Sequence, residues 1–243
     1  MHTIQLKKVC NKVIVMLSIA VIEPEYEINL GYIARVMKNF GLEELLLINP
    51  KCDISKARIY ATHGSDILDN AKIVSKDYLK NYDQLIGTTA IKASSRMNII
   101  RDAISPEDAV ISKNACLILG RESTGLTNDE LALCDLIITI NAGKYNTLNI
   151  SHALAIILYE LTEKKDANVN NASREEIELL LNYVLMLAKK AGIKEHKHKH
   201  LEHSLKRLLG RALPTSREVK LLVILLRKAI LAIERNKILS DKN

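Results

Sequence analysis

Polar side chains that could take part in chemistry gather in two loops, each of which follows a run of apolar residues. The first loop begins at Gly120 and contains Glu122, and the second contains Thr147 and Asn149. Each apolar run has the length of a buried strand, and open α/β sheets bind their ligands where such strands end. A helix that starts after Asn149 would add free backbone N–H groups at the same place. The sequence therefore predicts a ligand site between the two loops.

A third set of polar residues lies earlier, in an amphipathic helix expected over residues 25–40. Asn29 fits the cap of this helix, Gly31 permits the close approach of another backbone, and Arg35 by itself fits a surface charge. Glu122 could in the same way anchor its loop or an arginine. Residue types alone leave a structural and a functional interpretation open for each of these positions.

Several catalytic and nucleotide-binding motifs are absent. The chain has no G-x-G-x-x-G after a strand, no G-K-[ST], no H-E-x-x-H and no G-x-S-x-G. Their absence argues against dinucleotide binding, nucleotide hydrolysis, zinc proteolysis and serine hydrolysis. The 4 cysteines show no C-x-x-C spacing, so we expect reduced thiols in a cytoplasmic protein, with no disulfide and no bound metal. No apolar run reaches the roughly 18 residues of a membrane span, so no membrane segment is expected.

Three motifs carry a resemblance to a known family. Residues 29–35 read N-L-G-Y-I-A-R, residues 120–128 read G-R-E-S-T-G-L-T-N, and residues 145–151 read Y-N-T-L-N-I-S. In this order they resemble the sequence boxes of the SpoU/TrmH group of SPOUT methyltransferases. One departure is Thr147, where the closing box usually carries Ser. Thr keeps the hydroxyl group and adds a methyl group.

This resemblance implies an α/β fold with a parallel sheet, helices on both faces and a deep trefoil knot built from residues 117–161. Such knots are rare exceptions among protein chains. It also implies a homodimer with each site near the subunit boundary, and S-adenosylmethionine as the cofactor. The cofactor-binding positions that it implies are Thr88, Thr89, Ala90, Gly120, Ile140, Asn146, Thr147 and Leu148.

The reaction implied is methylation of a ribose 2′-hydroxyl in RNA, not DNA. This hydroxyl is a weak nucleophile, so the site must lower its pKa or take its proton as the methyl group is transferred. The resemblance places Arg35 where its charge would favour the developing alkoxide. It makes Asn29 the residue that positions the ribose or Arg35. Glu122 would orient a partner, and Asn149 would support the substrate pocket.

Apolar runs that alternate with helical patterns predict a mainly parallel α/β body. The strands are expected at residues 13–22, 45–48, 71–74 and 85–86, in the run that ends at Gly120, and at 136–140. The polar loop over residues 91–101 could close over a substrate phosphate or be a plain surface connection.

The charge of the chain is unevenly distributed. Residues 164–243 hold 18 Lys/Arg and 9 Asp/Glu, a net charge of +9, which leaves −2 for the rest of a chain whose total is +7. A near-neutral body with a basic helical tail suits a protein whose tail helps to hold a polyanion, although a solvated Lys-rich face fits equally well. The His- and Lys-rich run at residues 194–200 suits a phosphate contact or a solvated turn better than a metal site.

Three parts are expected along the chain: a knotted methyltransferase domain at residues 1–163, a polar linker at 164–172, and a basic helical domain at 173–243. The tail helices are expected at 174–191, at 200–209 with Gly210 as the stop, and at 216–238.

Residues 205–212 and 215–222 resemble the C-terminal extension of the TrmJ-type members of the family, which act on tRNA. This resemblance implies 2′-O-methylation of a tRNA ribose, at the cytidine or uridine of position 32 in the anticodon loop. Two alternatives remain open at this point. The same site could methylate ribosomal RNA, or the chain could be a non-catalytic RNA-binding protein of the same fold.

Overall fold

The computed structural model describes residues 16–90, 102–143, 147–162 and 171–240 of the chain. These residues form one sheet of six parallel strands in the order β3-β2-β1-β5-β4-β6. The strands are β1 (Met16–Ile22), β2 (Leu45–Ile48), β3 (Lys72–Ile73), β4 (Gln84–Thr88), β5 (Asn114–Leu119) and β6 (Leu136–Ile138). The predicted parallel α/β sheet is confirmed, and β6 ends two residues earlier than expected.

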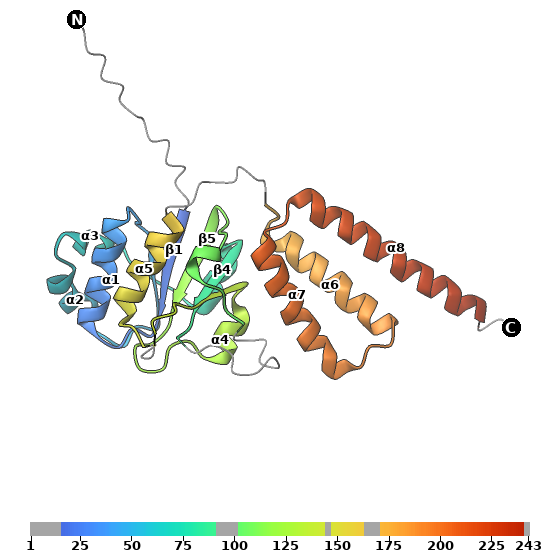
Figure 1. Ribbon diagram of the computed structural model, residues 1–243, viewed down its shortest axis with the longest axis horizontal. Coiled ribbons are helices and arrows are strands. Elements are labelled where there is room, and N and C mark those ends of the chain that lie inside the picture. The colour runs from blue at the N-terminus through green and yellow to red at the C-terminus, as the bar shows by residue number, and fades with distance from the viewer. Residues whose placement is uncertain (1–15, 91–101, 144–146, 163–170, 241–243) are drawn as a thin grey trace, which may run out of the picture.

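Both faces of the sheet are covered, because successive side chains of a strand point to opposite faces and here both sets are apolar. Ile19 of β1 is buried on one face, in a cluster with residues of α1 (Glu27–Asn39) and α5 (Ile150–Thr162). Ala20 is buried on the other face, in a cluster with residues of α4 (Asn128–Leu133). In Figure 1, α1 and α5 lie together on one side of the strands, and α4 lies by β4.

Helix α1 crosses α2 (Ile54–Ala61) closely at Gly31. A Cβ atom at this position would come within 2.5 Å of the carbonyl oxygen of Ala57, so the contact requires glycine. The close backbone approach that Gly31 permits is therefore made to α2. A third short helix, α3 (Ser65–Asp69), follows α2 and also contacts α1.

The tail consists of three helices, α6 (Arg174–Lys190), α7 (His198–Ala212) and α8 (Ser216–Ser240). Leu180 of α6 and Val219 of α8 are buried in a small cluster of their own. Figure 1 shows the three helices side by side, next to the part of the body that holds β4 and α4. The predicted run at residues 194–200 forms a 3-10 turn and the first turn of α7.

The predicted helix end at Gly210 is wrong, because α7 continues to Ala212. Gly210 lies inside the helix, where a Cβ atom would come 2.2 Å from the carbonyl oxygen of Asp135 in the body. The glycine is therefore required for close contact between helix and body. Gly192 has a φ of +76° and lies two residues after the last residue of α6, where a left-handed glycine commonly ends a helix.

No helix in the described part of the chain is both long and apolar enough to cross a bilayer. The described cysteines, Cys52, Cys116 and Cys134, are free thiols. Burial raises the pKa of Cys52 to about 11 and that of Cys134 to about 12, so both stay protonated near neutral pH.

Candidate active site

Neighbouring strands bring the predicted cofactor positions to one edge of the sheet. Strand β4 lies between β5 and β6, so the loops after all three strands adjoin. Thr88 ends β4, and its hydroxyl group donates to the carbonyl of Ile118 in β5 at 3.2 Å. The backbone N–H of Thr89 donates to the carbonyl of Ile138 in β6 at 3.0 Å. These bonds tie the ends of the three strands together.

Gly120 directly follows β5 and opens a tightly closed loop. Arg121 and Gly125 exchange two backbone hydrogen bonds, of 2.8 Å and 3.3 Å, across the loop. A Cβ atom on Gly120 would come within 2.2 Å of Gly125, and Gly125 has a φ of +67°. Both positions therefore require glycine for a physical reason, since one needs space and the other a left-handed backbone.

The remaining cofactor positions differ in exposure. Ile140 and Leu148 are half-buried, whereas Ala90 and Thr147 are exposed. Asn146 and the predicted loop over residues 91–101 lie outside the described residues.

Thr139, next to Ile140, was not singled out from the sequence. It is only 3% exposed, and its hydroxyl group has no hydrogen-bond partner among the described residues. A buried hydroxyl without a partner is costly, so this edge of the sheet fits a site that a polar ligand completes.

Three of the four predicted catalytic residues form one hydrogen-bonded cluster. The side-chain amide of Asn149 donates to the side-chain oxygen of Asn29 at 2.8 Å. The amide of Asn29 in turn donates to the carboxylate of Glu122 at 3.3 Å. The side-chain oxygen of Asn149 accepts from the backbone N–H of Ser151 at 2.9 Å, which fixes Asn149 at the start of α5. Each of the three sequence motifs thus contributes one member to the cluster.

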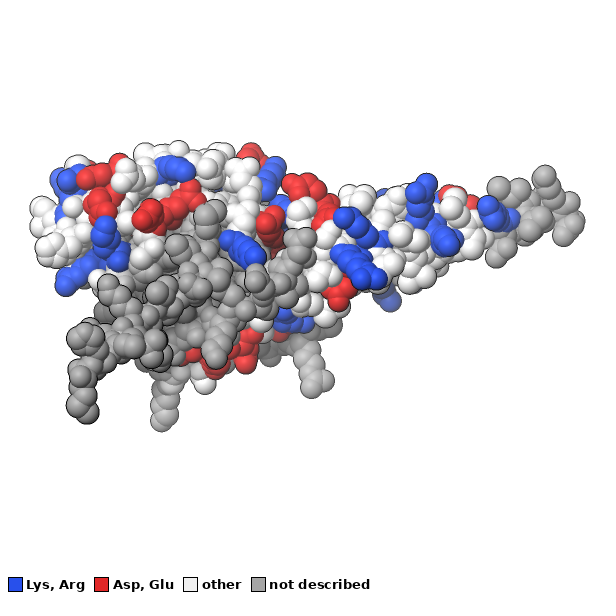
Figure 2. Space-filling view, turned by 90° about the horizontal axis from the view of Figure 1, so that it is seen from above, with Lys and Arg blue, Asp and Glu red and all other residues white. Residues whose placement is uncertain are grey.

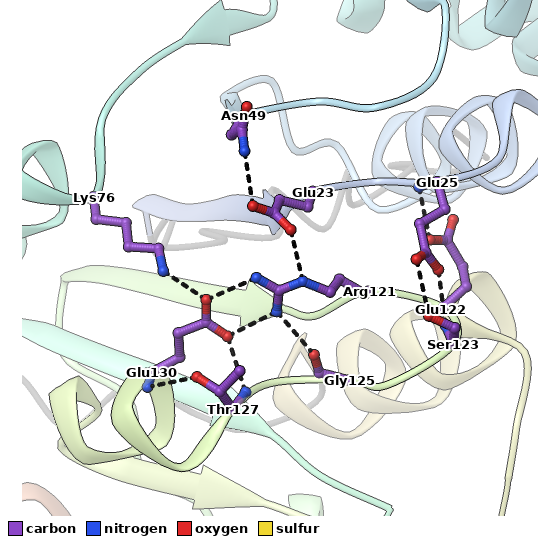
Figure 3. A network of polar contacts seen from close by, with 10 residues as sticks. All are labelled: Glu23, Glu25, Asn49, Lys76, Arg121, Glu122, Ser123, Gly125, Thr127 and Glu130. Carbon is purple, nitrogen blue, oxygen red and sulfur yellow. Dashed lines mark hydrogen bonds and ion pairs between the residues drawn. The ribbon is translucent and has the colours of Figure 1, made fainter.

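Hydrogen bonds in both directions connect the start of α1 with the loop after β5. Glu122 accepts hydrogen bonds from the backbone N–H groups of Glu25 at 2.9 Å and Tyr26 at 3.4 Å. Glu25 accepts from the backbone N–H of Ser123 at 2.9 Å and from its hydroxyl group at 2.8 Å. Figure 3 shows the two carboxylates crossing between the segments. Glu25, an acidic residue shortly before Asn29, thus makes its hydrogen bonds within the fold.

Arg121, which the sequence analysis did not single out, is the centre of a second network (Figure 3). Its guanidinium donates to Glu23 at 2.8 Å and to both oxygens of Glu130 at 3.0 and 3.1 Å. Lys76 also donates to Glu130, at 2.6 Å. Glu130 closes a capping box with Thr127 at the start of α4. The T-N-D-E sequence of residues 127–130 is typical of a helix start, and nothing in it points to Arg121.

The charges in this network stabilise one another. Burial alone would raise the pKa of Glu130, but hydrogen bonds from Arg121, Lys76 and the backbone of Thr127 outweigh it and lower that pKa to about 2. The pKa of Arg121 is raised, first by its hydrogen bonds to Glu130. The loop of residues 121–125 is thus fixed by ion pairs that persist at neutral pH.

Arg35 does not join the cluster within this chain. It lies six residues after Asn29 in α1, which is roughly 240° around a helix, so the two side chains leave on different faces. Asn29 is buried, whereas Arg35 is exposed. The structure therefore places Asn29, Glu122 and Asn149 together and leaves Arg35 on the surface.

The sequence model of the SpoU rRNA Methylase family matches residues 16–159, which is more than half of the chain. The chain belongs to the SpoU rRNA Methylase family. This confirms the family predicted from the three motifs, all of which lie inside the matched residues.

Two proteins with curated names are similar to this chain over nearly their whole lengths. The tRNA (cytidine-2'-O-)-methyltransferase TrmJ of Methanocaldococcus jannaschii is 37% identical over 221 residues, covering 84% of this chain and 96% of the relative. The protein of the same name from Sulfolobus acidocaldarius is 34% identical over 231 residues, covering 92% of this chain and 97% of the relative.

A solved structure has the same fold as this chain. The crystal structure of TrmJ from Z. mobilis ZM4 superposes with a TM-score of 0.64 at 23% identity, covering 87% of this chain and 97% of that chain. At this identity the likeness shows a shared fold.

Proposed function

We propose that this chain transfers a methyl group from S-adenosylmethionine to the 2′-hydroxyl of a tRNA ribose, at the cytidine or uridine of position 32 in the anticodon loop. Membership of the SpoU family supports the reaction, and the TrmJ names of the two relatives support the substrate. The observation that carries the proposal is the Asn29–Glu122–Asn149 cluster, because it joins all three family motifs at the carboxyl ends of the strands.

We assign the following roles to the residues of this chain. The cofactor, which supplies the methyl group when bound, would be held by Thr139 together with the predicted positions Thr88, Thr89, Ala90, Gly120, Ile140, Asn146, Thr147 and Leu148. Asn29 and Asn149 would orient the ribose, since the hydrogen bonds between them fix the direction of both amides. Arg35 would stabilise the negative charge that develops on the 2′-oxygen.

An exposed apolar stripe supports a homodimer. Ile28 and Tyr32 are exposed on α1, and Ile156 and Tyr159 are exposed on α5, which packs beside it. Arg35 follows Ile28 and Tyr32 at helical spacing and so shares their face. A dimer through this stripe would carry Arg35 to the subunit boundary. It would act in a site completed by the second copy, which accounts for its position outside the cluster of its own chain.

The finer architecture belongs to the same proposal. Residues 117–161 would form the trefoil knot within a body of residues 1–163, followed by a linker at 164–172 and a tRNA-binding tail at 173–243. Figure 2 shows mainly Lys and Arg, with fewer Asp and Glu, along the tail, whereas Asp and Glu are more prominent on the body. The exposed cations of α8 include Arg217, Arg227, Lys228 and Arg235.

Methyl transfer from labelled S-adenosylmethionine to unmodified tRNA, followed by nucleoside analysis, tests the proposal. A 2′-O-methylated cytidine or uridine at position 32 is the expected product. Label on ribosomal RNA alone would show that the substrate is ribosomal RNA and that the proposed methyl transfer takes place. No transfer to any RNA, together with no binding of the cofactor, would leave only a non-catalytic RNA-binding protein.

A further inference from the structure

Helix α7 of the tail docks on the last turn of α4. Lys206 donates from Nζ to the carbonyl oxygen of Leu133 at 3.0 Å, and Arg207 donates from Nη2 to that of Leu131 at 2.9 Å. The last carbonyls of a helix are short of partners within the helix, so Lys206 supplies a donor to Leu133, and Arg207 adds a second donor to the carbonyl of Leu131, which also accepts from the backbone N–H of Cys134 at 3.2 Å. Arg207 is only 4% exposed. A charge buried to this extent serves the fold, because a phosphate of a bound RNA cannot reach it.

A second contact holds α7 in place beside α4. Gly210 lies against the backbone of Asp135, at the start of β6, and its carbonyl oxygen accepts from the side chain of Gln84 at 2.9 Å. The carboxylate of Asp135 accepts from Arg174 of α6 and from the backbone N–H of Leu85, both at 2.7 Å. The tail is therefore attached to the body at defined positions on α4, β4 and β6.

Helix α4 also holds the loop that opens at Gly120. Glu130, the residue before Leu131, forms the capping box with Thr127 and binds both Nη atoms of Arg121. Arg207 of the tail thus binds the carbonyl of Leu131, and Arg121 of the loop binds the carboxylate of Glu130, the preceding residue of the same short helix. A shift of α4 would move Glu130 and, with it, the loop of residues 121–125.

We propose that Arg207 is a positioning residue for the cofactor loop and acts through α4. The tail would then serve the cofactor site as well as the RNA, and displacing α7 would weaken cofactor binding. The inference rests on the proposed function, because it takes the loop at Gly120 to be part of the cofactor site.

Two variants of the chain test this proposal, and each disturbs the contact between α7 and the body by a different change. Arg207→Met removes the buried charge and its hydrogen bond at similar length, whereas Gly210→Ala keeps every charge and introduces a clash with Asp135. Alanine ordinarily favours a helix interior over glycine, so a loss in Gly210→Ala reports undocking. Lys189→Met, which removes an exposed cation of the same tail, is the matched control.

Calorimetric titration with S-adenosylmethionine and fluorescence titration with tRNA give the two readouts. We expect the cofactor Kd to rise about tenfold in both Arg207→Met and Gly210→Ala, the size of a typical coupling between linked sites. The tRNA Kd should change by less than about threefold, and Arg207→Lys should recover part of the cofactor affinity. Lys189→Met should leave the cofactor Kd unchanged.

Unchanged cofactor affinity in both variants, with native circular dichroism, would overturn the inference. So would a loss of tRNA affinity alone in Arg207→Met, which would make Arg207 an RNA contact. Should Arg207→Met fail to fold, Gly210→Ala and the milder Lys206→Met decide the matter by the same readouts. A wild-type chain that does not bind the cofactor would instead refute the proposed function, and this outcome is distinct from variants that bind as the wild type does.

Discussion

The side-chain amide of Asn149 donates to the side-chain oxygen of Asn29 at 2.8 Å, although 120 positions separate the two residues in the chain. Because the amide of Asn29 is also engaged, by Glu122, the side chain of Asn29 is held at both ends. A fixed amide is what a site requires if it is to orient a hydroxyl group for in-line transfer.

Asn29→Asp should destabilise the fold more than Asn29→Ala. In the aspartate variant an oxygen replaces the donor that lies 3.3 Å from the carboxylate of Glu122, so a hydrogen bond becomes a like-charge contact. A cost of about 2 kcal/mol would lower the Tm by about 4–8 °C in a chain of this size. Thermal unfolding followed by circular dichroism measures this. Equal Tm values for the two variants would mean that a negative charge at position 29 does not repel the carboxylate of Glu122.

Arg35→Ala should lower kcat for methyl transfer by about a hundredfold or more, because the developing alkoxide loses its positive partner. Binding of tRNA should stay within about tenfold, and the fold should be kept because Arg35 is exposed. Lys38→Ala, which removes a neighbouring exposed charge of α1, is the control. Equal losses of binding and transfer would show that Arg35 holds RNA and does not act in the chemistry.

Ile156→Glu should convert a dimer into monomers. The substitution places a charge in the exposed apolar stripe of α1 and α5, where burial against a second copy would leave it unpaired. Sedimentation velocity measures the oligomeric state. Ile73→Glu, at another strongly exposed isoleucine on β3, should leave it unchanged. A wild-type chain that sediments as a monomer at all concentrations would contradict the dimer directly.

The ion pairs of Glu130 predict an acid-sensitive fold. The pKa of Glu130 is lowered to about 2 from an ordinary value of 4.5. A lowered pKa stabilises the folded state above the unfolded-state value, so this contribution is complete above about pH 4.5 and is lost as pH falls toward 2. Its size is on the order of 3 kcal/mol.

Urea unfolding at a series of pH values tests the role of Glu130. Glu130→Gln should be less stable than the wild type at pH 7, and its stability should fall less between pH 5 and pH 2.5. Asp129→Asn, an exposed acid of the same turn, should keep the wild-type pH profile. If the Glu130→Gln profile matched that of the wild type, the acid sensitivity would have to arise from other groups.

Arg227→Gln combined with Lys228→Gln should weaken tRNA binding and reduce its salt dependence. Loss of two phosphate contacts lowers the slope of log Kd against log salt by about 1.5. Lys56→Gln combined with Lys80→Gln makes the same change in net charge at exposed positions on the body. An equal effect of both pairs would show that net charge, and not the tail surface, attracts the RNA.

The sheet could be predicted because its strands are local apolar runs. That Asn29, Glu122 and Asn149 belong to one site followed from the resemblance of their three motifs to one family, and not from the residue pattern itself. The Arg121 network could not. Glu23 and Glu130 are far from one another in sequence, and their residue types fit ordinary surface turns. The face on which Arg35 lies follows from its spacing of six residues from Asn29, which helical geometry could have revealed in advance.

The tail shows a different limit of sequence reasoning. A count of Lys and Arg correctly marks it as basic, but cannot say which cations face the body. Arg174, Lys206 and Arg207 contact the body, and Arg211 pairs with Asp102. Gly210 fitted a helix stop, because a stop and a close helix contact both favour glycine and only the packing distinguishes them.

The two edges of the sheet are protected in different ways. Strand β3 is only two residues long and begins with Lys72, and such short, charged edges resist pairing with other chains. Strand β6 pairs with Ile104 near its end, and α7 covers Asp135 at its start. A chain cut at residue 173 would lose that cover as well as its basic surface. Self-association of the shortened body through β6 would then lower RNA binding even if no tail residue touched RNA.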